Sequence, residues 1–145
     1  MTDEAGPRVA DEAPEHPNAT LVRTLFSALV ARDTEAALGC YAENGVYRVS
    51  GNNLVSGNYR GRAAILSHHI KLMELTGGTM ELTLEDLIAE DDHAVLFWHV
   101  TAERAGTSQS LNANGIMAFK IDDQGKFSES WFLYNDRRAY DDFFS

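Results

Sequence analysis

Two adjacent histidines, His68 and His69, stand in a stretch that otherwise has the pattern of an amphipathic helix. Successive helical residues are turned by about 100°, which places both imidazoles on the side of Ile65 and Leu72, away from Lys71. An imidazole titrates near neutral pH and can act as a general acid or base. Two inward imidazoles favour a polar or wet space such as a ligand pocket, because burying both in a dry core is unfavourable. A core histidine bonded to a backbone carbonyl is the alternative for each.

A carboxylate in the last expected strand, residues 126–135, adds a second candidate group. Phe127, Glu129 and Trp131 share one face of this strand. That face carries the bulkier side chains, so we expect it to point inward and to bury Glu129 under Trp131. A buried carboxylate needs a partner or a raised pKa. Glu129 could therefore orient an imidazole or act as an acid.

A third candidate lies in the expected strand 94–102, where His99 shares a face with Phe97. Both faces of this strand are apolar, and we expect the His99 face to point inward. The predicted catalytic residues are His69, His99 and Glu129.

Aromatic and apolar residues could supply the wall of a pocket for a flat or polycyclic ligand. The predicted substrate-binding residues are His68, Trp131, Asn135, Met117, Tyr47, Tyr59 and Phe26. Ordinary core packing is the alternative for the apolar ones. A metal site from the three catalytic candidates is a further alternative, but no HxxxH or CxxC spacing, phosphate-binding loop or dinucleotide-type glycine pattern occurs. We therefore expect no metal and no cofactor.

Composition bounds the class of protein. The chain has 145 residues, of which 44% are hydrophobic, and this suits one domain with one core. A net charge of −10 and a pI near 4.8 argue against partners such as nucleic acid or an anionic membrane. Cys40 is the only cysteine, so no internal disulfide can form. No signal-like apolar run follows the acidic start, and a cytoplasmic location is expected.

The order of elements predicts the fold class. Residues 1–16 are acidic and read as a disordered tail, followed by a single domain over 17–145. Helical spacing begins near Pro17, and the histidine helix lies between Gly61 and the Gly77-Gly78 pair. From Thr79 onward four strands follow one another, and a short last helix comes after them. Helices followed by an antiparallel meander indicate α+β.

This order of elements resembles that of the nuclear transport factor 2-like superfamily, and several short sequence segments resemble those of its SnoaL-like polyketide cyclase branch. The segments that carry the resemblance are Asn58-Tyr59-Arg60-Gly61-Arg62, residues 72–78, residues 100–104, residues 131–136 and Ala139-Tyr140-Asp141. The resemblance covers residues 17–145 and implies a conical barrel, in which a curved antiparallel sheet wraps around the N-terminal helices and encloses a pocket. It does not imply one reaction, because this fold hosts cyclases, isomerases, hydrolases, dehydratases and binding domains.

The departures from the family pattern bear on the reaction. Steroid isomerases of this fold use a tyrosine on the first helix, an aspartate after the first strand and a buried acid on the third long strand. At the positions that match these three catalytic residues, this chain has Leu25, then Val49 or Ser50, and then Met117. A ketosteroid isomerase is therefore rejected. SnoaL-like cyclases carry an acid/base aspartate near the end of the last strand, where this chain has Asn135, an amide that can hydrogen-bond but not take a proton. The neighbouring Asp136 is expected to cap a helix.

Two functions remain open at this point. The first is a cofactor-free enzyme that performs acid/base chemistry (cyclisation, isomerisation, dehydration or epoxide opening) on a small hydrophobic, polyketide-like metabolite. The second is a non-catalytic small-molecule binding module with the same pocket. The paired histidines favour the enzyme, and Asn135 favours the binding module. The family resemblance also implies a homodimer through the outer sheet face, where Trp98, Phe132 and Tyr134 are expected to lie.

Overall fold

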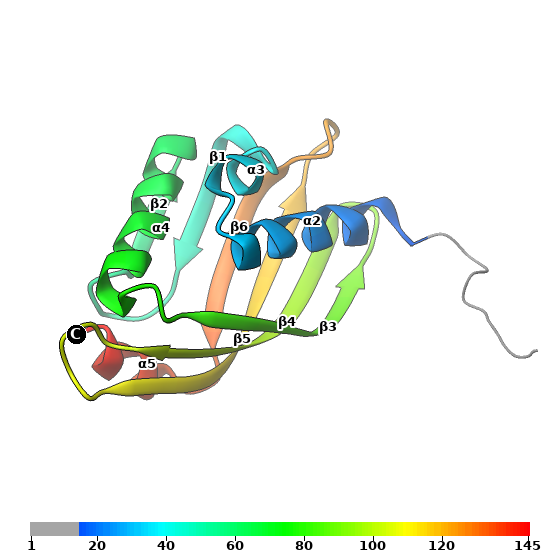
Figure 1. The fold of residues 1–145 in the computed structure, drawn as a ribbon. Coiled ribbons are helices and arrows are strands. Elements are labelled where there is room, and N and C mark those ends of the chain that lie inside the picture. Colours follow the sequence, from blue (N-terminus) through cyan, green and yellow to red (C-terminus); the bar gives the residue numbers. More distant parts are fainter. Residues whose placement is uncertain (1–14) are drawn as a thin grey trace, which may run out of the picture.

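A computed structural model describes residues 15–145 of the chain, so the expected tail lies, up to residue 14, outside the described residues. Figure 1 shows helices packed against one curved sheet. In chain order the elements are α2 (Pro17–Ala31), α3 (Thr34–Leu38), β1 (Tyr41–Val49), β2 (Gly57–Arg60), α4 (Arg62–Thr76), β3 (Glu81–Ala89), β4 (His93–Glu103), β5 (Ser110–Ile121), β6 (Phe127–Tyr134) and α5 (Arg137–Phe143).

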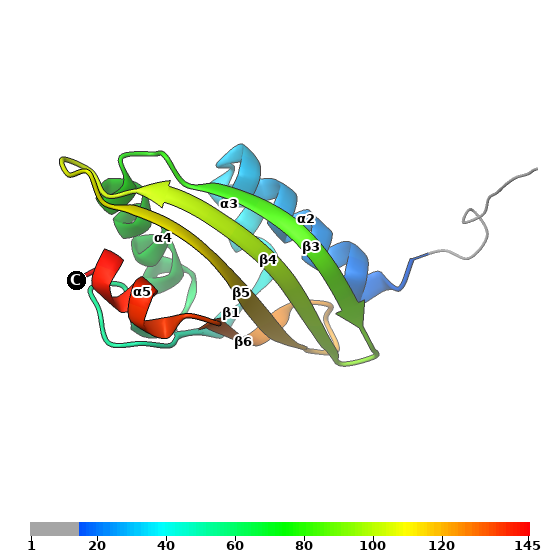
Figure 2. The same ribbon diagram turned by 90° about the horizontal axis from the view of Figure 1, so that it is seen from below.

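The six strands form one sheet in the order β2-β1-β6-β5-β4-β3. Neighbouring strands are antiparallel except for β1 and β6, which pair in parallel. The long strands β3, β4 and β5 arch strongly, and the sheet does not close on itself (Figure 2). The α+β class with a curved sheet is thus confirmed, and the expected barrel is an open one.

The helices cover the concave face of the sheet. Helix α2 packs over β3 and β4, and α4 packs over β1 and β2. Pro17 stands at the start of α2, where a backbone N–H would form no hydrogen bond within the helix, so proline costs no hydrogen bond there. Val22, Leu25 and Phe26 recur at helical spacing and are buried. The two helices thereby face each other across the concave side.

Local signals fix where the other helices begin and end. Helix α4 starts after Gly61, with φ 87°, and ends at Gly77, with φ 59°. Both values lie in a region that favours glycine, as the sequence predicted. The carboxylates of Asp33 and Asp136 cap α3 and α5 by accepting hydrogen bonds from the N–H groups of Ala36 and Ala139.

The expected facing of β6 is wrong, because a β-bulge interrupts its alternation. Ile121 of β5 pairs with Phe127, and Lys120 pairs with Glu129, so Ser128 is an extra residue in β6. Phe127, Ser130 and Phe132 are consequently buried on the concave face. Residues 129 and 131 lie on the convex face instead.

The expected facing of β4 is also wrong. Leu96, Trp98 and Val100 are buried on the concave face, and His99 lies on the convex face with Phe97. Alternation along β4 was predicted correctly, but apolar side chains occupy both faces and gave no reliable sign of direction.

Candidate functional site

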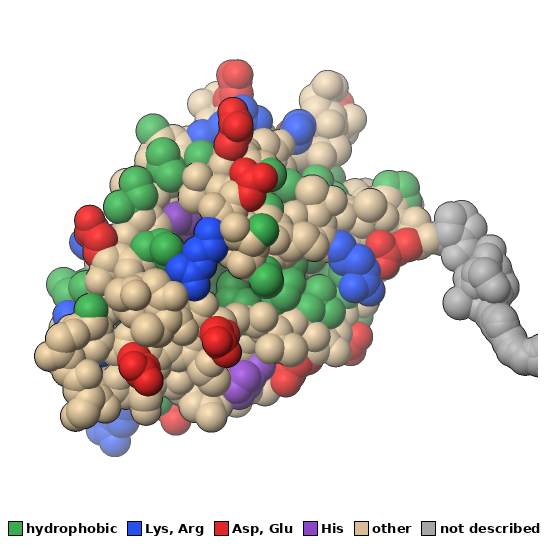
Figure 3. All heavy atoms as spheres, viewed as in Figure 1, with side chains coloured by type: hydrophobic (Ala, Val, Ile, Leu, Met, Phe, Trp, Pro, Cys, Tyr) green, Lys and Arg blue, Asp and Glu red, His purple; other side chains and the backbone are tan. Residues whose placement is uncertain are grey.

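A pocket opens between the helices and the concave face of the sheet. Its volume is about 470 Å³, which is typical of small-molecule sites. In Figure 3, hydrophobic side chains gather in a hollow at the opening, and charged side chains lie along the rim. We call it the central pocket, and its inner wall includes Phe26, Tyr47, His69, Trp98, Met117 and Phe132.

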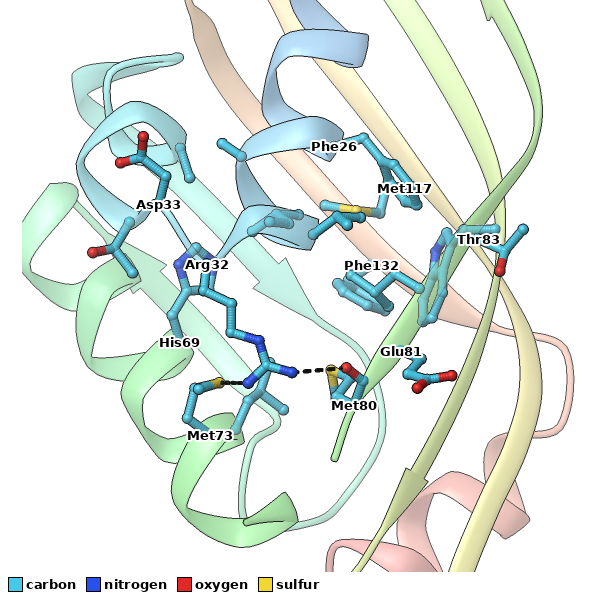
Figure 4. A pocket seen from close by; sticks show the side chains of 18 of the residues that line it. Phe26, Arg32, Asp33, His69, Met73, Met80, Glu81, Thr83, Met117 and Phe132 are labelled. Carbon is cyan, nitrogen blue, oxygen red and sulfur yellow. Dashed lines mark hydrogen bonds between the residues drawn. The ribbon is translucent and has the colours of Figure 1, made fainter. Parts of the chain in front are cut away.

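The apolar part of this wall is assembled from distant parts of the chain. Figure 4 shows Phe26 reaching in from α2 while Met117 and Phe132 reach in from β5 and β6. The ring of Phe132 packs at 5.9 Å from that of Tyr47 in β1 and at 4.8 Å from that of Trp98 in β4, both edge to face. Such packing fixes the rings in place. The wall therefore suits a flat, largely apolar ligand.

His69 brings an ionisable side chain from α4 into this apolar space (Figure 4). Its Nδ1 is inaccessible to solvent and has no hydrogen-bond partner in residues 15–145, which leaves Nε2 as the ring nitrogen open to the pocket. Burial lowers the pKa of His69 to about 4. The imidazole is therefore neutral near pH 7.

His68 lies directly behind the pocket wall rather than in it. The side chain is 1% exposed, and neither ring nitrogen has a hydrogen-bond partner in the described part of the chain. Its ring packs at 5.0 Å from Tyr47 and at 4.8 Å from Tyr59. Burial, with smaller contributions from His69 and Lys71, lowers the pKa of His68 to about 3. Both imidazoles point inward, as the helical spacing predicted, but only one of them lines the pocket.

The phenols that line the pocket are held neutral as well. Burial raises the pKa of Tyr47 and of Tyr134 well above the ordinary value near 10. The buried indole Nε1 of Trp98 is a donor without a partner among the described residues. The ionisable groups of the inner wall are therefore uncharged at neutral pH, and they can interact with a ligand only through neutral hydrogen bonds.

Charged residues occur at the mouth of the pocket, where all of them are exposed: Arg32, Asp33 and Glu81. The Arg32 guanidinium donates to the carbonyls of Gly78 (2.8 Å) and Met80 (3.1 Å) and contacts the Sδ of Met73 at 3.1 Å (Figure 4). Arg32 thus links the end of α2 to the segment between α4 and β3 at the edge of the opening.

The structure brings four of the predicted site residues together in the central pocket: His69, Met117, Tyr47 and Phe26. Tyr59 packs behind the wall against His68, and its hydroxyl donates to the carbonyl of Val55 at 2.7 Å. The roles of these residues in binding or catalysis stay predictions.

Glu129 and Trp131 do not face the pocket, contrary to the expected facing of β6. The carboxylate of Glu129 forms a salt bridge of 2.5 Å with Arg48 of β1 on the convex face. The Arg48 guanidinium lies 5.6 Å from the centre of the Trp131 ring. The bulge at Ser128 is the physical reason for the reversal, because one extra residue sends the following side chains to the opposite face.

His99 and Asn135 are also outside the central pocket. The Nδ1 of His99 pairs with the Oδ1 of Asn114 at 2.6 Å on the convex face. Asn135 is exposed and borders a separate hollow of about 270 Å³, which Asn114 and Leu133 also line. The structure therefore separates His69 from the two groups that were expected to work with it, His99 and Glu129.

Sequence reasoning missed the aromatic residues of the sheet that do line the pocket, namely Trp98, Phe132 and Tyr134. They had been expected on the outer face, in a dimer contact. One signal could have found Trp98: Gly115 interrupts an otherwise regular strand, and an isolated glycine in a strand often marks the close approach of another group.

Metal-binding clusters and membrane-spanning helices are both absent from residues 15–145. These residues contain no group of three or more His, Cys, Asp or Glu side chains arranged to hold a metal ion. No helix in this part of the chain has the length and apolar character needed to span a membrane.

Comparison with known proteins connects this geometry to a family. The family model described as SnoaL-like domain matches residues 22–130. No curated protein matches the chain.

Solved structures with the same fold cover nearly the whole described chain. Bal32a from a soil-derived mobile gene cassette is 25% identical, with a TM-score of 0.83 over 89% of this chain and 97% of that one. TerC co-crystallized with polyporic acid is 17% identical, with a TM-score of 0.78 over 89% and 98%. An NTF2-like protein from Burkholderia xenovorans is 18% identical, with a TM-score of 0.75 over 89% and 96%. The nuclear transport factor 2-like fold is thereby shown.

Proposed function

The chain belongs to the SnoaL-like domain family, and we propose that it is a cofactor-independent enzyme acting on a small, hydrophobic, polyketide-like metabolite in the central pocket. The observation that carries the proposal is an apolar pocket of about 470 Å³ into which α4 carries one imidazole, that of His69. The similar structure of TerC was obtained with polyporic acid, which supports a small organic ligand for this fold.

His69 is proposed to act as a neutral hydrogen-bond donor. Its Nδ1 is buried without a partner, and a buried acceptor without a partner is better tolerated than a buried N–H without one. The proton is therefore assigned to Nε2, which is the nitrogen open to the pocket. An Nε2–H donor can polarise a carbonyl and stabilise an oxyanion that develops from it, as neutral imidazoles do in other enzymes.

The general-base role expected from the sequence fits this site less well. A base with a pKa of about 4 holds a proton weakly at neutral pH. A catalytic imidazole that takes a proton is also commonly oriented by a carboxylate or carbonyl on its other nitrogen, and the described residues offer His69 no such partner. Cyclisation, isomerisation, dehydration and epoxide opening each involve an oxygen that a neutral donor could activate.

Replacement of His69 tests the role of the donor. With an aromatic polyketide-type ketone as substrate, His69→Phe is expected to lower kcat by about a hundredfold, the size of effect seen when one oxyanion donor is removed. His69→Gln keeps an N–H group that cannot titrate, so it should retain more of the rate than His69→Phe. Equal loss in both variants, with wild-type affinity in each, would contradict the donor role.

A non-catalytic binding module is the second candidate. It is favoured by the lack of a carboxylate in the inner wall among the described residues, since Glu129 lies on the convex face and Asp33 and Glu81 are exposed at the mouth. For a binding module, the wild type turns over no ketone of the panel, and His69→Phe keeps or gains affinity in calorimetry. Measurable wild-type turnover that His69→Phe abolishes decides for the enzyme.

A homodimer through the convex face is proposed alongside. Leu133 is 45% exposed there, with Phe97 and Ile116 half-buried beside it on the neighbouring strands. Light scattering after size exclusion should give twice the chain mass, and Leu133→Asp should lower it. Leu54→Asp replaces a similarly exposed side chain away from the sheet and should leave the mass unchanged.

A further inference from the structure

Gly115 stands in the middle of β5, where its own φ angle does not require a glycine. Its φ is not positive, unlike that of Gly61 or Gly77, so a residue with a side chain could adopt the same conformation. Glycine weakens a strand interior. The reason for glycine at this position must therefore lie in what surrounds it.

Two groups crowd the position of a side chain at residue 115, the indole of Trp98 and the backbone carbonyl of Leu133. A Cβ added at residue 115 would lie 2.6 Å from Cζ2 and 2.8 Å from Cε2 of Trp98, and 2.8 Å from the carbonyl oxygen of Leu133. The indole thus occupies the space that a side chain at position 115 would need.

The pairing of the strands explains how the indole comes to lie there. Trp98 of β4, Gly115 of β5 and Tyr134 of β6 are direct neighbours across the sheet, so they form one row. Without a side chain in the middle of the row, the indole can reach across to Tyr134, at a ring distance of 5.4 Å. Phe132 meets the same indole edge to face at 4.8 Å. All three aromatic residues line the central pocket.

We propose that Gly115 is a specificity-determining residue that sets the depth of the central pocket by letting Trp98 lie down against the sheet. This inference rests on the proposed use of the pocket for ligand binding. A side chain at position 115 would push the indole off the sheet and into the cavity, because Phe132 and Tyr134 already occupy the space beside it. The glycine therefore admits ligands with several fused rings, whereas a larger residue would restrict the pocket to single rings.

The proposal is tested by affinity as a function of ligand size. Phenol, 2-naphthol and 9-phenanthrol carry the same hydroxyl on one, two and three rings, and calorimetry gives a Kd for each without any need for turnover. Gly115→Ala is expected to raise the ratio of the phenanthrol Kd to the phenol Kd at least tenfold. An unchanged ratio would overturn the proposal.

A second variant changes Trp98 instead of Gly115. It keeps the test valid if Gly115→Ala does not fold because of the nearby carbonyl of Leu133. Trp98→Phe retains Gly115 and places a smaller ring above it. The Kd ratio should then fall below the wild-type value or equal it. A ratio that rises in Trp98→Phe contradicts the idea that the indole limits ligand size.

A spectroscopic readout separates this inference from the proposed function. The chain has two tryptophans, and Trp131 lies on the convex face, so Trp131→Phe leaves Trp98 as the only indole. In that background, Gly115→Ala should shift the Trp98 emission to longer wavelength as the indole moves toward the open pocket. Absence of binding to all three phenols in the wild type would count against the proposed function, whereas absence of the emission shift would overturn the role of Gly115.

Discussion

Polar side chains on the convex face of the sheet and polar side chains around the central pocket differ in how their atoms are paired. On the convex face His99 is bonded to Asn114, and Glu129 is paired with Arg48. On the concave side the Nδ1 of His69 and the Nε1 of Trp98 are buried and have no partner within residues 15–145. These convex-face groups are thus paired, whereas the two buried atoms beside the pocket are not.

This difference supports the proposal that a ligand binds on the concave side. Buried polar atoms normally find partners, and leaving one unpaired costs about 1–3 kcal/mol. Around the central pocket, unpaired atoms occur in side chains that line about 470 Å³ of space. A ligand in this space could hydrogen-bond to the accessible Nε2 of His69, whereas the unpaired Nδ1 of His69 and Nε1 of Trp98 are themselves inaccessible to solvent. The paired groups of the convex face have no such unmet requirement.

The largest expected effect comes from two neighbouring residues of β6 that point to opposite faces. Phe132 is 9% exposed and packs against Trp98 and Tyr47, so Phe132→Ala should lower the free energy of unfolding by about 3–5 kcal/mol. Trp131 is half-buried and contacts Arg48, so Trp131→Ala should cost about 1 kcal/mol. Urea unfolding monitored by circular dichroism measures the free energy of unfolding of both variants. Equal losses in the two variants would show that the facing of β6 is not as described.

The next largest expected effect is a dependence of the free energy of unfolding on pH, which follows from the burial of His68. Its pKa in the folded protein is about 3, compared with an ordinary value of 6.5. Between these values the unfolded chain binds a proton at His68 that the folded chain does not, so stability falls as the pH falls. The free energy of unfolding should lose up to about 1.4 kcal/mol per pH unit from this residue. Urea unfolding at intervals between pH 6.5 and pH 4.5 measures the slope.

Substitution of His68 isolates its contribution. His68→Leu removes the imidazole and both of its unpaired nitrogens, so the slope should become flatter by about 1 kcal/mol per pH unit, with little loss of stability at pH 7. Ile65→Val, in the same face of α4, is the control: it should lower stability by about 1 kcal/mol at every pH and leave the slope alone. A slope that His68→Leu does not change would contradict the buried, neutral state of His68.

The smallest expected effect lies on the convex face. Arg48 and Glu129 are each about a third exposed, with side-chain exposures of 33% and 31%, so water and salt weaken their attraction. Glu129→Gln should change the free energy of unfolding by less than about 1 kcal/mol, and by less still in 0.5 M salt. A loss of several kcal/mol that salt does not reduce would place Glu129 in a buried site after all.

The helices and their inward faces were predictable from the sequence, because the signals that determine them are local. Gly61 and Gly77 bound α4, and Asp33 and Asp136 cap the helices that follow them. The inward direction of His68 and His69 follows from helical periodicity, which needs no knowledge of distant residues. The family resemblance and the α+β class were predictable for the same reason, since they depend on the order of elements.

Only the tertiary structure decided which face of each strand lines the pocket. In β4, apolar side chains occur on both faces, so hydrophobicity could not distinguish the face of Trp98 from that of His99. In β6, the extra residue Ser128 reverses the alternation, and its position depends on pairing with β5. Trp98 and Phe132 therefore line the pocket although they were not predicted to, and His99, Glu129 and Trp131 do not line it although they were predicted to. The face to which a strand's side chains point is set by its register with distant strands, which the sequence of a single strand does not encode.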